Sequence, residues 1–250
     1  MSAAEFLIVL VAGLGAGTIN AVIGSGTLIT FPVLLAVGYP PVVANVSNNV
    51  GLVPGSLTAL YGWRRELRGR WRHALGLAAG SAAGSLIGSL LLLSLPEAAF
   101  EVIVPVLIAG ALVLVAFQPR ISRWVEARRR PGRARGGPLL RGGIFATGVY
   151  GGYFGAAQGI LLFALLGTAL PDDLQHANAL RNLLAGTANG VAAVVFLAAA
   201  DVAWAAALAL AVGAAAGGVI GARVGRRLSP AALRVVVVIV GLTAIARLIL

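Results

Sequence analysis

The chain contains no cysteine and only two histidines, His73 and His176. Without cysteine there can be no disulfide framework, no metal–thiolate site and no thiol chemistry. With only two histidines, we expect no histidine-based metal centre, and we expect no cofactor. The sequence also has no Ser/His/Asp set, HExxH, CxxC or Walker loop, so we do not expect an enzyme.

Charged residues are scarce as well. They make up 11% of the 250 residues, whereas 59% are hydrophobic and the mean hydropathy is +0.96. A soluble domain could not hide so much apolar surface from water. Several apolar stretches exceed the roughly 20 residues that span a bilayer. These properties predict an all-α integral membrane protein that crosses the cell inner (plasma) membrane several times, with the lipid bilayer as its surroundings.

Acidic residues are absent from the middle of the apolar stretches. The segment ends and loops carry Glu97, Glu101, Glu126, Asp172, Asp173 and Asp201. No carboxylate is therefore placed to relay protons, and His176 is the only nearby titratable candidate. The net charge of +11 comes from arginines in loops beside apolar segments. That is the positive-inside pattern of membrane proteins, so we expect no nucleic-acid partner.

What the chain does contain is an internal repeat. Residues 44–49 reappear as residues 177–182, and Trp71 reappears as Trp204, both with an offset of 204 − 71 = 133. The same offset carries Gly80, Gly84 and Gly88 onto Gly213, Gly217 and Gly221. Glycines four residues apart are typical of closely packed membrane helices. We predict a first membrane repeat in residues 1–117, a basic cytoplasmic linker in 118–141 and a second membrane repeat in 142–250.

About eight hydrophobic segments can be marked. They cover residues 5–37, 42–63, 73–93, 98–117, 142–170, 174–199, 202–224 and 231–250. The first would be about 50 Å long as one helix at 1.5 Å per residue, against a hydrocarbon core of about 30 Å. It contains Gly24-Ser25-Gly26, and the fifth segment is similarly rich in glycine. We therefore expect the first and fifth segments to be broken or re-entrant.

The arginines favour one topology. If the first and fifth segments enter and return, the three basic stretches near residues 64–72, 120–141 and 223–227 all lie in the cytoplasm. The two repeats are then inverted relative to each other, with both termini outside. If all eight segments cross, the last basic stretch lies on the wrong side. We favour inverted repeats, and eight plain spans remain the alternative.

Two stretches in each half resemble the TauE/SafE-type sulfite exporter family. In the first half they are GSGTLITFPVLLAVGYPP, residues 24–41, and ANVSNNVGLVPGSLTALYGWRREL, residues 44–67. In the second half they are ANALRNLLAGTANGVAAVVFLAAADVAW, residues 177–204, and GAAAGGVIGARVGRRLSPAALR, residues 213–234. The resemblance covers nearly the whole chain. It implies export or exchange of sulfite, organosulfonates and related small anions.

The two breaks predict part of a binding site. Helix fragments that begin at a break direct free N–H groups at it, and such N-termini attract anions. The residues expected at the site are Gly24, Ser25, Gly26, Thr27, Gln158 and Gly159. The alternative is that the glycines only permit close helix packing.

Polar side chains within the second and sixth segments predict the rest of the site. They are Asn45, Asn48, Asn49, Asn178, Arg181 and Asn182, with the same i, i+3, i+4 spacing in both segments. Such residues usually face a cavity or a partner in membrane proteins. Arg181 could bind an oxyanion through its planar fork. Alternatively, it reaches the interface or pairs with Asp172 or Asp173, and the asparagines form interhelical hydrogen bonds.

These observations predict a transporter, most simply an exporter, of a small anion with a midplane site between the repeats. The alternatives are a proton-linked carboxylate permease, an intramembrane enzyme of lipid or phosphoryl chemistry, and a membrane scaffold without transport. The sequence does not indicate the oligomeric state.

Overall fold

The computed structural model describes residues 1–128, 137–170 and 174–224, together with part of 233–243. These residues are helical throughout, without a strand. The elements are α1 (Ala3–Val22), α2 (Thr27–Ala36), α3 (Pro41–Trp63), the 3-10 turn η1 (Arg64–Leu67), α4 (Trp71–Ser94), α5 (Glu97–Arg128), α6 (Pro138–Tyr153), α7 (Gln158–Ala169), α8 (Leu174–Ala199) and α9 (Trp204–Val224). The predicted segment 231–250 lies largely outside the described residues.

Within the described residues, the predicted hydrophobic segments are helical. Five of these helices are long and apolar enough to cross a membrane, namely α1, α4, α5, α8 and α9. Proline at the first helical position starts both α3 and α6, because its fixed φ suits a helix start and its missing N–H costs nothing there. Helix α5 continues to Arg128 through Pro119, so residues 118–128 are helical rather than an irregular linker.

The first and fifth segments are both broken, as predicted. In the first, the N–H groups of Ile23 and Gly24 both donate to the Ile19 carbonyl, and Gly24 has φ +83°. In the fifth, Phe154 and Gly155 both donate to the Tyr150 carbonyl, and Gly155 has φ +74°. A left-handed glycine ends a helix without the steric cost that other residues incur. Each segment therefore becomes two helices, α1–α2 and α6–α7.

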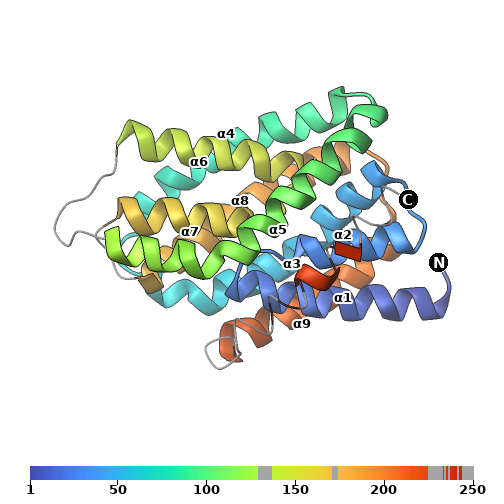
Figure 1. Ribbon diagram of the computed structural model, residues 1–250, viewed down its shortest axis with the longest axis horizontal. Coiled ribbons are helices and arrows are strands. Elements are labelled where there is room, and N and C mark those ends of the chain that lie inside the picture. The colour runs from blue at the N-terminus through green and yellow to red at the C-terminus, as the bar shows by residue number, and fades with distance from the viewer. Residues whose placement is uncertain are drawn as a thin grey trace.

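Each broken pair enters and leaves at one end of the bundle. At one end, Tyr39 between α2 and α3 donates to the sulfur of Met1 at 3.7 Å, so α1 starts beside the point where α2 has ended. At the other end, one hydrophobic cluster joins the start of α6 to the end of α7 and includes Leu140, Leu166 and Ala169. Neither pair crosses from end to end, as Figure 1 allows the reader to follow.

The second of these ends carries most of the arginines that the structure describes, and we call it the arginine-rich end. The end of α3, the turn η1 and the starts of α4, α6 and α8 meet there in the same cluster, which contains Trp63, Leu67, Ala74, Leu140 and Ala177. Helix α9 also ends there. Ala222, near the end of α9, lies so close to Gly62, near the end of α3, that a Cβ added to Gly62 would touch it. The end of α5 lies there as well, because a Cβ added to Gly167 near the end of α7 would touch Val125. The basic loop around η1 and the ends of α5 and α9 thus lie on one side.

Each broken pair packs against the other half of the chain. Helix α1 lies along α9, and α6 lies along α4 (Figure 1). A Cβ on Gly217 would overlap the Leu14 carbonyl of α1, and a Cβ on Gly88 would overlap the Val149 carbonyl of α6. The predicted packing role of the glycine ladders is confirmed at these positions. Among the six ladder glycines, only Gly80 has room for a side chain, since an added Cβ would lie 3.8 Å from its nearest neighbour, Ile144.

Candidate functional site

The two breaks meet in the centre of the bundle. The N–H of Gly159, in the first turn of α7, donates to the Gly24 carbonyl at 3.2 Å. A Cβ on either glycine would lie 2.6 Å from the Cα of the other, closer than real Cβ contacts allow. Only glycine permits this backbone crossing. It brings the C-terminus of α1 and the N-terminus of α7 to one place.

A cavity of about 30 Å³ lies beside this crossing. It is lined by Asn20, Gly24, Thr27, Ser56, Ala59, Gly155, Gln158, Gly159, Arg181, Asn182, Ala185, Gly186 and Asn189. A cavity of this size holds water. The lining is polar, in a bundle whose other interior contacts are mainly apolar.

Arg181 is the charged residue of this lining. It lies two turns into α8, is only 4% exposed, and reaches the end of α1. Its guanidinium donates to the carbonyls of Ala21 at 3.2 Å, Val22 at 3.3 Å and Ile23 at 3.3 Å. Its Nε has no partner among the described residues. The arginine thus caps the negative end of α1 while keeping one buried donor unused.

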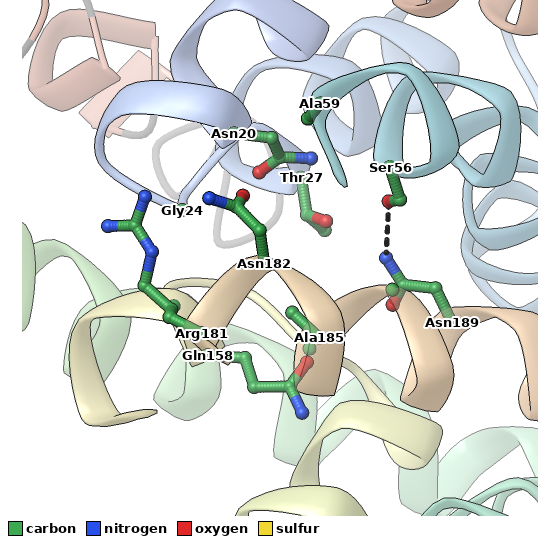
Figure 2. Close-up of a pocket in the computed structure, with 13 residues that line it drawn as sticks. Asn20, Gly24, Thr27, Ser56, Ala59, Gln158, Arg181, Asn182, Ala185 and Asn189 are labelled. Carbon is green, nitrogen blue, oxygen red and sulfur yellow. Dashed lines mark hydrogen bonds between the residues drawn. The ribbon is translucent and has the colours of Figure 1, made fainter. Parts of the chain in front are cut away.

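Amides and hydroxyls complete the lining. Figure 2 shows the Asn182 side chain directed towards Asn20, while Arg181 extends beside Gly24. The Nδ2 of Asn182 donates to the Asn178 carbonyl at 3.0 Å. Across the cavity, Asn189 of α8 donates to the Ser56 hydroxyl of α3 at 3.4 Å (Figure 2).

Half of the predicted site residues line this cavity: Gly24, Thr27, Gln158, Gly159, Arg181 and Asn182. The other half do not: Ser25, Gly26, Asn45, Asn48, Asn49 and Asn178. Several of these are used between helices instead. Asn45 donates to the Tyr153 carbonyl at the end of α6 at 2.9 Å, and Asn48 bonds to Thr27 and Thr30 of α2.

The free N–H groups expected at the breaks are already occupied at two positions. The N–H of Gly26 donates to Asn20 Oδ1 at 2.6 Å, and that of Gly159 donates to Gly24. The Gln158 amide, expected as a donor in the site, donates to the Thr147 carbonyl at 2.9 Å. A helix fragment whose N-terminus meets another chain segment satisfies its donors there, which sequence spacing alone does not reveal.

Sequence reasoning missed Asn20, Ser56 and Asn189. Two of them carried a usable signal, because 189 − 56 = 133 is the repeat offset and both are polar within apolar segments. Asn20 lies just before the first break, where it caps the Gly26 N–H. A search for polar residues at equivalent positions would have found the Ser56–Asn189 pair.

The cavity offers hydrogen-bond donors and one positive charge. No carboxylate and no histidine line it, and the described residues contain no cluster of three or more potential metal ligands. His176 lies elsewhere, at the start of α8, and its Nδ1 is 2.8 Å from the carbonyl of Glu66 in η1. The lining therefore suits the binding of an anion or a polar solute better than acid–base chemistry.

Apolar membrane-length helices around a polar cavity at two helix breaks define a multi-pass membrane protein of the transporter class. The sequence model of the family described as "Sulfite exporter TauE/SafE" matches residues 9–248, and the chain belongs to this family. It is thus a member of a family of membrane transporters, not of enzymes.

Curated relatives agree with this assignment. A "Probable membrane transporter protein" of Haemophilus influenzae is 29% identical over 194 residues, which cover 77% of this chain and 74% of the relative. The "Probable membrane transporter protein YfcA" of Escherichia coli K12 is 28% identical over 191 residues, covering 76% and 69%. No solved structure matches the chain.

Proposed function

We propose that the protein exports sulfite, an organosulfonate or a related small anion across the cell inner membrane, and that the cavity at Arg181 is its binding site. The observation that carries this proposal is a buried guanidinium with an unused donor, lining a polar cavity at the crossing of two broken helices. A charge is costly inside a membrane protein, and its retention marks a function.

The local charge supports an anion. Arg181 contributes one full positive charge, and the helix end that it caps contributes about half a negative charge. The N-termini of α2 and α7 face the same region and each contribute about half a positive charge. The C-terminus of α6, which ends beside the lining residue Gly155, contributes about half a negative charge, so the helix ends roughly cancel and the sum is about one positive charge. An oxyanion could draw the guanidinium from the carbonyls of α1 and accept its bidentate fork.

The two halves support a rocking mechanism between inverted repeats. Helices α8 and α9 begin 133 residues after α3 and α4, since 174 − 41 = 133 and 204 − 71 = 133. The packing is also reciprocal, with α1 on α9 and α6 on α4. Each broken pair begins and ends at one end of the bundle. We place the arginine-rich end in the cytoplasm by the positive-inside rule.

Membrane voltage then favours export. An interior-negative potential supplies about 2.3 kcal/mol per unit charge per 100 mV for an anion that moves outward. No proton-binding group is needed for this direction. The rival, a proton-linked carboxylate permease, requires a titratable group at the site, and the residues that line the cavity include no carboxylate or histidine.

Flux measurements in proteoliposomes test the proposal. Sulfite, sulfonates, sulfate and carboxylates are compared, while voltage and pH gradient are varied separately. We expect flux of sulfite or a sulfonate that follows voltage at constant pH. Carboxylate flux that follows the pH gradient and ignores voltage would instead establish the rival.

A further inference from the structure

Three buried polar side chains near the breaks have unused hydrogen-bonding atoms. Among the described residues, no partner exists for Ser25 Oγ, Asn49 Oδ1 or Tyr153 Oη. Their side chains are 1%, 9% and 8% exposed, and none of them lines the cavity. Buried polar atoms without partners are rare and destabilising, so each calls for an explanation such as a ligand or a second conformation.

The repeat offset connects these three residues to the cavity. The counterpart of Ser25 is Gln158, that of Asn49 is Asn182, and that of Tyr153 is Asn20, because 158 − 25, 182 − 49 and 153 − 20 all equal 133. All three counterparts line the cavity. Each unpartnered group is thus the repeat counterpart, in the other half of the chain, of a residue that lines the cavity.

Contacts along α3 gather these residues around one stretch of helix. Asn45 holds the Tyr153 carbonyl at 2.9 Å, and Asn49 follows one turn later on the same face. Between them, Asn48 bonds to Thr27 and Thr30, the start of the helix that follows Ser25. Residues 45–49 of α3 therefore lie between the first break and the end of α6.

This stretch lies in the half of the bundle away from the arginine-rich end. The cavity takes Arg181, Asn182 and Ala185 from the part of α8 near that end. Residues 45–49 come from the part of α3 near the opposite end. The Ser56–Asn189 hydrogen bond joins α3 and α8 between the two regions, at positions that are each other's counterparts.

We propose that Ser25, Asn48, Asn49 and Tyr153 form a second, uncharged binding site for the same small anion, which opens to the opposite side as the Arg181 cavity closes. The inference rests on the proposed function and on inverted repeats. Inverted repeats rock against each other around the region where they meet. We extend this to the lining: when the two halves exchange conformations, the counterparts of the cavity residues line the path on the opposite side. The hydroxyls of Ser25 and Tyr153 and the amides of Asn48 and Asn49 then supply the donors.

The two sites differ in charge at one position. The counterpart of Arg181 is Asn48, since 181 − 48 = 133, so a cation on the arginine-rich side is replaced by a neutral amide on the other. An anion is therefore held more tightly on the arginine-rich side. Half-saturation of transport is reached at a lower anion concentration from that side than from the opposite side.

Cysteine accessibility tests the second site, because the natural chain has no cysteine. Ser25→Cys reports on the second site and Ala185→Cys on the cavity, each in membrane vesicles of known orientation with an impermeant thiol reagent. Ser85→Cys, whose natural hydroxyl is buried against the Ala188 carbonyl between α4 and α8, is the protected control. We expect Ala185→Cys to react from the arginine-rich side, Ser25→Cys from the opposite side, and Ser85→Cys from neither.

Two results would overturn the second site: Ser25→Cys reacting from the same side as Ala185→Cys, or Ser25→Cys staying as protected as Ser85→Cys in transport-competent protein. Saturating sulfite should change the two reaction rates in opposite directions. Two-sided labelling that no tested anion changes would retain the second path but reject the proposed substrate class.

Affinity provides an independent measurement. Tyr153→Phe removes one hydroxyl with little change in shape and should raise the anion concentration for half-saturation several-fold from the opposite side only. Asn48→Arg should lower it about tenfold from that side. Equal effects of Tyr153→Phe from both sides would contradict a second site, whether or not Asn48→Arg folds.

Discussion

At the scale of single residues, Arg181 has two functions that compete for one guanidinium. It caps the end of α1 at the carbonyls of Ala21, Val22 and the C-cap residue Ile23, and it is the charged group of the cavity. Capping by a cation stabilises a helix end by about 0.3–1 kcal/mol, and up to about 2 kcal/mol when partly buried. An anion that recruits the guanidinium must outweigh that amount.

Replacing Arg181 separates charge from geometry. We expect Arg181→Gln to weaken anion transport at least tenfold, which corresponds to about 1.4 kcal/mol, because the charge and the fork are both lost. Arg181→Lys keeps the charge but not the planar fork, and should fall between Gln and Arg. The measurement is sulfite flux per folded molecule.

The matched control is Arg72→Gln, an exposed arginine at the start of α4. It should transport normally. Normal sulfite flux by Arg181→Gln would remove Arg181 from the site and leave it with the capping function alone.

The sequence predicted Arg181 but could not predict its contacts. Its polar neighbours Asn178 and Asn182 marked the correct helix face, and the apolar surroundings indicated burial. Its nearest carbonyls come from residues 21–23, about 160 positions away in the chain. Periodicity carries no information about such distant contacts. The alternative partners Asp172 and Asp173 lie outside the described residues.

At the scale of helices, glycine is used for contact rather than for flexibility. Some glycines touch the backbone of a neighbouring helix, whereas others face open space. This distinction also affects the two breaks. A side chain at Gly159 would collide with Gly24, and one at Gly26 would collide with the Ala16 carbonyl, so bulk at either position disturbs packing as well as the site.

Alanine substitution at matched glycines tests these contacts. Gly88→Ala and Gly217→Ala should each lower stability by more than about 1 kcal/mol, since the added methyl overlaps a carbonyl oxygen of the facing helix. Gly76→Ala in α4 and Gly110→Ala in α5 have nothing within 4 Å and should be neutral or stabilising. Thermal unfolding in detergent measures all four. Equal losses in both pairs would refute the packing explanation.

The positions of the helix breaks were the most predictable part of the fold. The hydrogen-bond partners of the N–H groups at the breaks were the least predictable. Length against bilayer thickness, together with Gly24-Ser25-Gly26, was sufficient to predict the first break. The sequence could not show that the released N–H groups of Gly26 and Gly159 would be taken by Asn20 and Gly24. Those acceptors are supplied by the meeting of two segments, which is a property of the assembled bundle.

At the scale of the whole molecule, the two halves are interleaved rather than placed side by side. Each broken pair packs on the fourth helix of the other half. The sequence indicated duplication but not this exchange, because an offset relates equivalent residues and not residues in contact. The division at residues 117 and 142 stays a prediction about the chain, and it is not a boundary between separate cores.

Sided labelling tests the inverted arrangement. Ser94 ends α4, and Arg223 lies at the end of α9, the corresponding helix of the other half. We expect Ser94→Cys to react with an impermeant reagent from outside and Arg223→Cys only from the cytoplasm. Arg68→Cys in the basic loop should behave like Arg223→Cys. Labelling of Ser94→Cys and Arg223→Cys from the same side would reject inversion.

The packing of α1 on α9 also determines when the protein can assemble during its synthesis. Thr18 of α1 donates to the Gly217 carbonyl of α9, which is 199 positions later in the chain. The ribosome therefore adds 199 residues after Thr18 before this contact between α1 and α9 can form. Until then, the small-residue face of α1 is covered only by lipid or by the insertion machinery. A messenger truncated before α9 thus encodes an unassembled chain and not a smaller transporter.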